Sequence, residues 1–308
     1  RYKIQKRVTL VINQQIPFQF PNEITLDIKR EDLIHPFISG NKFRKLKYNL
    51  LKANEENKTQ LLTFGGAFSN HIAAVAYAGK KNNFETIGII RGDELESQIY
   101  ENPTLLFAQE CGMKFHFVTR EEYKDKNTDL FIEKFRNIYG DFYLIPEGGA
   151  NSLAVKGCEE ILTEEDSEYS HICCSIGTGG TISGLINSSH SHQKIIGFPS
   201  LKGDFLSEDI RKFALKTNWE LITDYHFGGY GKINEELVRF INDFYQQTNI
   251  PLDPIYTGKM LYGIVDLIEK DYFPKGAKIL AIHTGGIQGI KGMNIYLKKK
   301  NLQQIITQ

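Results

Sequence analysis

The chain has 308 residues, of which 41% are hydrophobic and 24% are charged, which is the profile of an ordinary globular protein with room for two lobes around a cleft. Lysine plus arginine number 37, and aspartate plus glutamate also number 37. This balance argues against a protein that bulk charge holds on nucleic acid or on an anionic membrane.

Short apolar runs that end in glycine or proline alternate with helical patterns along the chain. The runs predict strands at 60–66, 85–92, 114–119, 142–149, 171–180, 194–199 and 278–286. Helical patterns follow at 69–81, 103–112, 129–140, 152–165 and 181–190. This alternation predicts an α/β fold with open, mostly parallel sheets flanked by helices, and such sheets bind ligands at their glycine-rich strand ends.

Domain boundaries leave a weaker signal, because no proline-rich or serine-rich linker separates two halves. The polar stretch ANEENKTQ (53–60) and the turn PEGGANS (146–152) are the best crossing points. They predict a small domain of residues 53–150 inserted into a larger, discontinuous domain of residues 1–52 and 151–308.

The segment SGNKFRKLKYNLL (39–51) places Lys42 at the start of an amphipathic helix. Phe43, Leu46 and Leu50 form the apolar stripe of this helix, and Arg44, Lys45 and Lys47 form its polar side. A lysine opposes the positive end of the helix dipole, which lowers the pKa of its amine and favours attack on an aldehyde. The alternative is a surface lysine among its basic neighbours.

The segment FGGAFSNH (64–71) leads from a strand into an alanine-rich helix for which Ser69 is a suitable N-cap. The free N–H groups of this helix, with Ser69, Asn70 and His71, suit the carboxylate of an amino acid. A capping motif without a ligand is the alternative.

The segment SIGTGGTISG (175–184) joins an apolar strand to a helix through a loop that contains Gly177, Thr178, Gly179, Gly180 and Thr181. Backbone N–H groups of such a loop can converge on one phosphate. No GK[ST] follows, as a nucleotide triphosphate would need, and Ile182 occupies the third glycine position of the dinucleotide fingerprint. A tight strand–helix turn is the alternative.

A metal site, a disulfide framework and a membrane span are not expected. His171, Cys173 and Cys174 would point to both faces of one strand. The cysteines number four and include no CxxC pair, which indicates free thiols in a reducing compartment. No signal peptide or apolar run of membrane-spanning length is present, so we expect a cytoplasmic protein.

Five motifs together resemble the 1-aminocyclopropane-1-carboxylate (ACC) deaminase/D-cysteine desulfhydrase family, which belongs to the tryptophan-synthase-β-like, fold-type II pyridoxal-phosphate (PLP) enzymes. The motifs are GNKFRKL (40–46), GGAFSNH (65–71), GTGGT (177–181), DPIYTGK (253–259) and HTGG (283–286). Their order covers nearly the whole chain. The resemblance implies two α/β lobes with PLP in the cleft, a small amino acid as substrate and, usually, a homodimer.

The resemblance also implies roles for individual residues. Lys42 would form the Schiff base with PLP, and the backbone of Gly177–Thr181 would hold the phosphate. Asn70 would hydrogen-bond the phenolic oxygen, and Ser69 with Asn70 and His71 would receive the substrate carboxylate. The remaining implied contacts are Tyr230 and Tyr256 on the substrate side and Thr284 near the pyridine nitrogen.

Two positions depart from the deaminase pattern. Thr257 occupies the position of the glutamate in the YEGK motif of those enzymes, and His71 stands where they carry glutamine. A glutamate beside the pyridine nitrogen strengthens PLP as an electron sink, which opening of a cyclopropane needs. A hydroxyl cannot hold that proton, so we expect β-elimination of thiol from D-cysteine, giving pyruvate, ammonia and hydrogen sulfide. ACC deamination, serine or threonine dehydration, racemisation and a PLP-fold binding protein without turnover remain alternatives.

Overall fold

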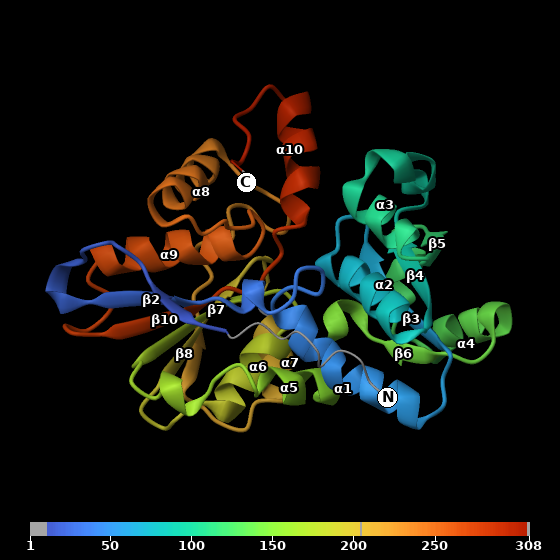
Figure 1. Ribbon diagram of the computed structural model, residues 1–308, viewed down its shortest axis with the longest axis horizontal. Helices are drawn as coiled ribbons and strands as arrows, with labels where there is room; N and C mark the ends of the chain where they lie inside the picture. The colour runs from blue at the N-terminus through green and yellow to red at the C-terminus, as the bar shows by residue number, and fades with distance from the viewer. Residues whose placement is uncertain (1–10, 204, 307–308) are drawn as a thin grey trace.

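The computed structural model describes residues 11–203 and 205–306, which form two sheets in separate lobes (Figure 1). The strands are β1 (Asn13–Gln15), β2 (Thr25–Lys29), β3 (Gln60–Gly66), β4 (Glu85–Arg91), β5 (Lys114–Val118), β6 (Tyr143–Ile145), β7 (His171–Ile176), β8 (Lys194–Pro199), β9 (Trp219–Leu221) and β10 (Lys278–Ile282). The α-helices are α1 (Asn41–Glu55), α2 (Asn70–Asn82), α3 (Pro103–Glu110), α4 (Asp129–Tyr139), α5 (Ser152–Cys158), α6 (Gly180–Ser188), α7 (Phe205–Arg211), α8 (Glu235–Thr248), α9 (Thr257–Glu269) and α10 (Gly289–Lys299).

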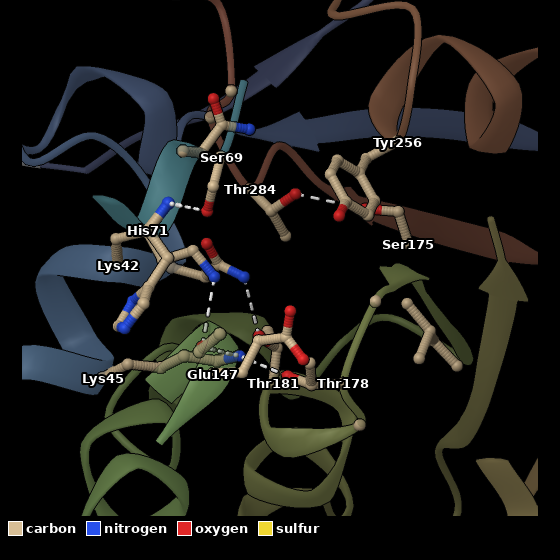
Figure 2. Close-up of a pocket in the computed structure, with 18 of the residues that line it drawn as sticks. Lys42, Lys45, Ser69, His71, Glu147, Ser175, Thr178, Thr181, Tyr256 and Thr284 are labelled. Carbon is tan, nitrogen blue, oxygen red and sulfur yellow. Dashed lines mark hydrogen bonds between the residues drawn. The ribbon is translucent and has the colours of Figure 1, made fainter. Parts of the chain in front are cut away.

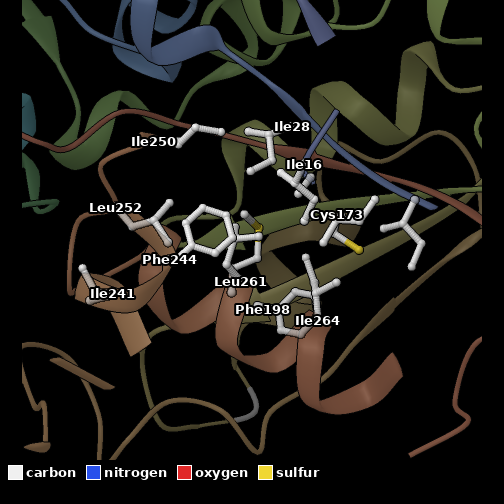
Figure 3. Close-up of a cluster of buried hydrophobic side chains, with 14 of the residues drawn as sticks. Ile16, Ile28, Cys173, Phe198, Ile241, Phe244, Ile250, Leu252, Leu261 and Ile264 are labelled. Atoms are coloured by element: carbon white, nitrogen blue, oxygen red, sulfur yellow. The ribbon is translucent and has the colours of Figure 1, made fainter. Parts of the chain in front are cut away.

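The larger sheet has the strand order β1-β2-β10-β7-β8-β9 and is parallel except for the edge pair β1 and β2. Its inner strands are apolar on both faces, because helices cover both. Strand β7 shows the alternation directly: Cys173 faces the cluster formed with α8 and α9 (Figure 3), whereas Cys174 and Ile176 face the cluster formed with α6 and α7.

The smaller sheet has the order β5-β4-β3-β6 and is parallel throughout. Helices α1, α2 and α3 pack on one face, and the aromatic side chains of α4 pack on the other. The alanines of α2 are buried, and short side chains allow this helix to lie close to its neighbours. The predicted α/β fold with mostly parallel sheets is therefore confirmed.

The main differences from the expected elements lie at α5, at three short strands, and at the helices α7, α8, α9 and α10, which were not expected. Helix α5 ends at Cys158 rather than at 165, because Thr163 caps a separate 3₁₀ turn at Glu164–Asp166. Strands β1, β2 and β9 were not expected, since two of them have only three residues and all lie toward the sheet edges.

The strands of the smaller sheet all lie between residues 60 and 145, and those of the larger sheet lie before and after them. Helix α1 runs through the expected boundary at 52–53. The division into residues 53–150 and the rest stays a prediction. No helix in the described ranges is both long and apolar enough to cross a membrane.

Each sheet has one topological switch point, where two neighbouring strands are connected to the rest of the sheet in opposite directions. In the smaller sheet this point lies between β3 and β6, and in the larger sheet it lies between β7 and β10. Open α/β sheets bind ligands in the crevice beyond the carboxyl ends of such strands. The four strand ends here are followed by residues that line one shared cavity, described next.

Candidate active site

A cavity of about 230 Å³ lies between the two lobes (Figure 2). It brings together most of the residues predicted from the sequence: Lys42, Ser69, Asn70, His71, Gly177, Thr178, Gly179, Thr181, Tyr230, Tyr256 and Thr284. Gly180 and Thr257 do not line it. Figure 2 shows Lys42 and Lys45 on one side of the cavity and Tyr256 and Ser175 on the other.

Lys42 is the second residue of α1, and Gly40 determines where this helix begins. Gly40 has φ of +61°, and a Cβ there would lie 2.0 Å from the carbonyl oxygen of Thr284. Only glycine fits this conformation and this approach. The amide of Asn41 donates to the same Thr284 oxygen at 3.2 Å, so the start of α1 is fixed against the loop that follows β10.

The amine of Lys42 is prepared to act as a nucleophile or base. Its Nζ donates to the carbonyl oxygen of Gly148 at 3.2 Å. Burial, followed by the neighbouring Lys45, holds the pKa of Lys42 well below its ordinary value. The expected lowering is thus present, although burial rather than the helix dipole is its leading cause.

Lys45 was placed on the polar side of α1, and this expectation was wrong. Its side chain is buried and points into the cavity, because residues one turn apart on a helix share a face and Lys45 lies three positions after Lys42. Its Nζ donates to Gly148 O at 3.1 Å and to Thr178 Oγ1 at 3.4 Å. The cation therefore stands directly beside the glycine-rich loop.

The glycine-rich loop joins β7 to the N-terminus of α6. Gly179 has φ of +80°, a left-handed conformation that the turn requires. Asn41 Nδ2 donates to Thr181 Oγ1 at 2.9 Å, which ties the loop to α1. Gly180 is buried, and a Cβ there would come within 3.4 Å of the Lys45 side chain. Helix N–H groups with an adjacent ammonium form a site for an anion.

Ser69 is the N-cap of α2, as expected, and its Oγ accepts from the backbone N–H of His71 at 3.2 Å and of Ile72 at 3.4 Å. The His71 ring is buried, and its Nε2 hydrogen-bonds Thr63 Oγ1 at 2.8 Å. Burial, with Lys42 and Lys45 nearby, holds the pKa of His71 well below its ordinary value. His71 is therefore neutral and cannot offer a positive charge to a carboxylate.

Tyr256 and Tyr230 form the opposite wall, with ring centroids 6.2 Å apart. Burial, followed by Tyr230 and Asp253, raises the pKa of Tyr256 well above its ordinary value. The hydroxyl of Tyr256 therefore keeps its proton at neutral pH and is available as a hydrogen-bond donor.

Thr257 does not stand where the resemblance implied. Its side chain is fully buried, and its hydroxyl donates to Asp253 Oδ1 at 2.7 Å and accepts from the Asp253 backbone N–H at 2.9 Å. The hydroxyls that line the cavity near Tyr256 belong to Thr284 and Ser175, whose oxygens are 3.1 Å apart.

Sequence reasoning missed several lining residues: Asn41, Lys45, Arg91, Glu147, Ser175 and Leu201. Helical spacing from Lys42 could have identified Lys45, and the ends of β4 and β6 could have identified Arg91 and Glu147. Glu147 accepts from the Tyr123 hydroxyl at 2.7 Å, and the Arg91 guanidinium lies 5.7 Å from the centroid of the Tyr123 ring. Leu201 carries no signal that separates it from an ordinary loop residue.

The cavity fits the cofactor that the resemblance implies. PLP needs an amine for its aldehyde and a cradle for its phosphate. Lys42 supplies the amine, and the Gly177–Thr181 loop with Lys45 supplies a cradle in which a Cβ at position 180 would crowd the Lys45 ammonium, at 3.5 Å from its Nζ.

Comparison with known proteins agrees with this fit. Residues 19–285 match the family described as "Pyridoxal-phosphate dependent enzyme". The bifunctional D-cysteine desulfhydrase/ACC deaminase of Arabidopsis thaliana is 32% identical, over 88% of this chain and 74% of the relative. A putative ACC deaminase of Pyrococcus horikoshii is 32% identical, over 91% of both chains.

The solved structures give the same result. The crystal structure of an ACC deaminase homologue superposes with a TM-score of 0.81 and 28% identity, covering 95% of this chain and 94% of that one. An O-acetylserine dependent cystathionine β-synthase from Helicobacter pylori shares the fold alone, with a TM-score of 0.68 and 14% identity over 94% and 97% of the two chains. The chain therefore belongs to the pyridoxal-phosphate dependent enzymes, in the family of ACC deaminases and D-cysteine desulfhydrases.

Proposed function

We propose that the protein catalyses the α,β-elimination of D-cysteine, in which D-cysteine and water give pyruvate, ammonia and hydrogen sulfide. The observation that carries this choice is the hydroxyl pair of Ser175 and Thr284 at the end of the cavity where the ring nitrogen is expected. A hydroxyl can donate a hydrogen bond there but cannot keep the nitrogen protonated. A weaker electron sink suits a thiolate leaving group better than a carbon one.

The acidic groups near the cavity support the same choice. Asp253 accepts four hydrogen bonds, from the backbone N–H groups of Ile255, Tyr256 and Thr257 and from the Thr257 hydroxyl. Its carboxylate is thus occupied. Among the described residues, Glu147 is the one acidic side chain that lines the cavity, and it is bound by Tyr123.

The residues have separable roles in this proposal. The Gly177–Thr181 loop and Lys45 would hold the phosphate, and Asn70 would donate to the phenolic oxygen. The start of α2, with Ser69, receives the substrate carboxylate. When bound, pyridoxal phosphate withdraws electrons from the substrate Cα and so makes its proton removable.

The chain's own groups then move the protons. Lys42 Nζ, whose lowered pKa increases the fraction of free amine at neutral pH, removes the proton from Cα. Tyr256 keeps its proton and donates a hydrogen bond to the departing sulfur, and Tyr230 closes the wall behind it. His71, the second residue of α2, is neutral and leaves the carboxylate to be held by N–H groups and hydroxyls.

A substrate panel tests the proposal. The PLP-loaded protein is given D-cysteine, L-cysteine, β-chloro-D-alanine, D-serine and ACC, and keto acid and sulfide are measured. We expect pyruvate and sulfide from D-cysteine. No sulfide from D-cysteine together with α-ketobutyrate from ACC would establish the deaminase instead, and turnover of D-serine alone would indicate a dehydratase.

We also propose that the protein works as a homodimer in the cytoplasm. An exposed aromatic stack supports the dimer: the ring of Phe37, which is 49% exposed, lies 4.6 Å from that of Tyr77 and 5.9 Å from that of Phe107. Four free cysteines support a reducing compartment. Sedimentation of the wild type against Phe37→Ser tests the first point, and cell fractionation tests the second.

A further inference from the structure

The side-chain amide of Asn70 is held by a residue of the opposite lobe. Gln288 directly precedes α10, and its Nε2 donates to Asn70 Oδ1 at 2.5 Å. The other end of the same amide, Gln288 Oε1, accepts from the hydroxyl of Thr104 at 3.0 Å. Gln288 thus bridges the start of α2 to the start of α3, and Figure 1 shows α10 facing α3 across the junction.

This chain of hydrogen bonds has a direction. A glutamine amide has one oxygen that accepts and one NH₂ group that donates. In the structure the Thr104 hydroxyl donates to the oxygen of this amide, the NH₂ group is turned to Asn70, and Asn70 presents its own oxygen in return. Asn70 Nδ2 is thereby left over. It has no hydrogen-bond partner among the described residues, and it lies 3.1 Å from where a Cβ on Gly286, a lining residue, would stand.

We propose that Gln288 is a positioning residue that acts through Asn70. It fixes the Asn70 amide so that an N–H, and not the oxygen, faces the phenolic oxygen of the cofactor. The inference rests on the cofactor contact assigned to Asn70 in the proposed function, and it adds the residue that determines which way this amide points.

The glutamate variant gives the sharpest test, because a carboxylate accepts hydrogen bonds but does not donate them. In Gln288→Glu, Asn70 must turn its NH₂ group toward residue 288 and its oxygen toward the cofactor. In Gln288→Ala, the amide is merely released. We therefore expect the glutamate variant to be impaired more than the alanine variant, although it is closer to glutamine in shape.

Two readouts need no substrate: the dissociation constant of PLP, and the pH midpoint of the long-wavelength absorbance of the bound cofactor. Loss of one oriented hydrogen bond should weaken PLP binding in Gln288→Ala by roughly threefold to tenfold. The pH midpoint should rise, because an N–H donor favours the deprotonated phenolic oxygen. Both changes should be larger in Gln288→Glu. Lys291→Gln, at an exposed site on the same helix, is the matched control and should change neither.

The double variant separates a positioning role from a merely structural one. In an Asn70→Ala background, Gln288→Ala should have no further effect on either readout. The inference would be overturned if Gln288→Ala had its full effect in the Asn70→Ala background. It would also be overturned if Gln288→Glu bound PLP and titrated like the wild type. If Asn70→Ala itself changes neither readout, Asn70 does not contact the cofactor, and that part of the proposed function is wrong. Absence of D-cysteine turnover would leave all these measurements unaffected.

Discussion

The two lysines of α1 share one acceptor, the carbonyl oxygen of Gly148, with N–O distances of 3.2 and 3.1 Å. One of them must be uncharged to react, and the other must be charged to hold a phosphate. Burial lowers the pKa of both, but the additional lowering from the neighbouring cation is part of the shift of Lys42. Lys45 therefore contributes to the reactivity of Lys42 as well as to anion binding.

The variant Lys45→Met should raise the pKa of Lys42, because it removes a positive neighbour and a competitor for Gly148 O. At neutral pH a smaller fraction of Lys42 would then be free amine. The rate at which the protein reacts with pyridoxal, which lacks the phosphate, should need a higher pH to reach its plateau. The rate is followed by absorbance from pH 6 to 10, with Lys42→Ala as the blank.

A matched control for this pH shift is Lys47→Met, at a more exposed position of the same helix that pairs with Glu160 at 2.7 Å. This variant should leave the profile close to that of the wild type. An unchanged profile in Lys45→Met would show that Lys45 does not influence the Lys42 amine.

At the scale of elements, the site depends on how two helices begin. Helix α1 begins directly after Gly40, which packs closely against the Thr284 carbonyl. A Cβ added to Gly40 would lie only 2.0 Å from the Thr284 carbonyl oxygen, so a side chain does not fit there. Helix α9 starts beneath Asp253, whose two carboxylate oxygens take three backbone N–H groups and one hydroxyl. Both starts place a site residue, Lys42 in one case and Tyr256 in the other.

Gly40→Ala should lower the free energy of unfolding by about 3 kcal/mol or more, because it adds a backbone clash to a positive φ. Gly276→Ala is the control: φ there is +75°, and an added Cβ meets nothing within 4 Å, so about 1 kcal/mol is expected. Urea unfolding measures both. Equal losses would show that the contact with Thr284 is unimportant.

Asp253→Asn should cost about 2 kcal/mol of stability, because an amide replaces one acceptor oxygen with donors that face other donors. It should also reduce turnover by displacing Tyr256. Asp271→Asn, whose carboxylate accepts from Asn22 at an exposed position, should change stability by less than about 0.5 kcal/mol. A variant Asp253→Asn that unfolds like the wild type would contradict this role.

The sequence predicts the parallel core of the molecule well, because buried strands such as β7 and β8 are continuous apolar runs that end in glycine or proline. The glycine loop and Lys42 are predictable for the same reason, since they depend on local pattern. The inward position of Lys45 is predictable once Lys42 is assigned to the site, because the two residues are three positions apart on one helix. The position of Thr257 away from the cavity is not predictable, because its hydroxyl binds Asp253, and only the tertiary fold determines where Asp253 lies relative to the cavity.

At the scale of the whole molecule, the cavity is built from four strand ends in two sheets: β3 and β6 in the smaller, β7 and β10 in the larger. A ligand that contacts all four should stabilise both lobes together, by an amount that rises with ligand concentration. Binding at one sheet alone would stabilise that lobe alone.

Hydrogen exchange with and without PLP distinguishes these cases. We expect slower exchange on PLP addition at Gly66 and Gly148 of the smaller lobe as well as at Thr178 and Gly285 of the larger one. Lys42→Ala should keep the protection at Thr178, where the phosphate is held, and reduce it at Gly148, because one of the two lysines that donate to the Gly148 carbonyl oxygen is lost while Lys45 remains. Amides of β5, at the far edge of the smaller sheet, are the internal control. Protection confined to the larger lobe would mean that PLP binds without bridging the two sheets, and it would contradict the expectation that one ligand stabilises both lobes together.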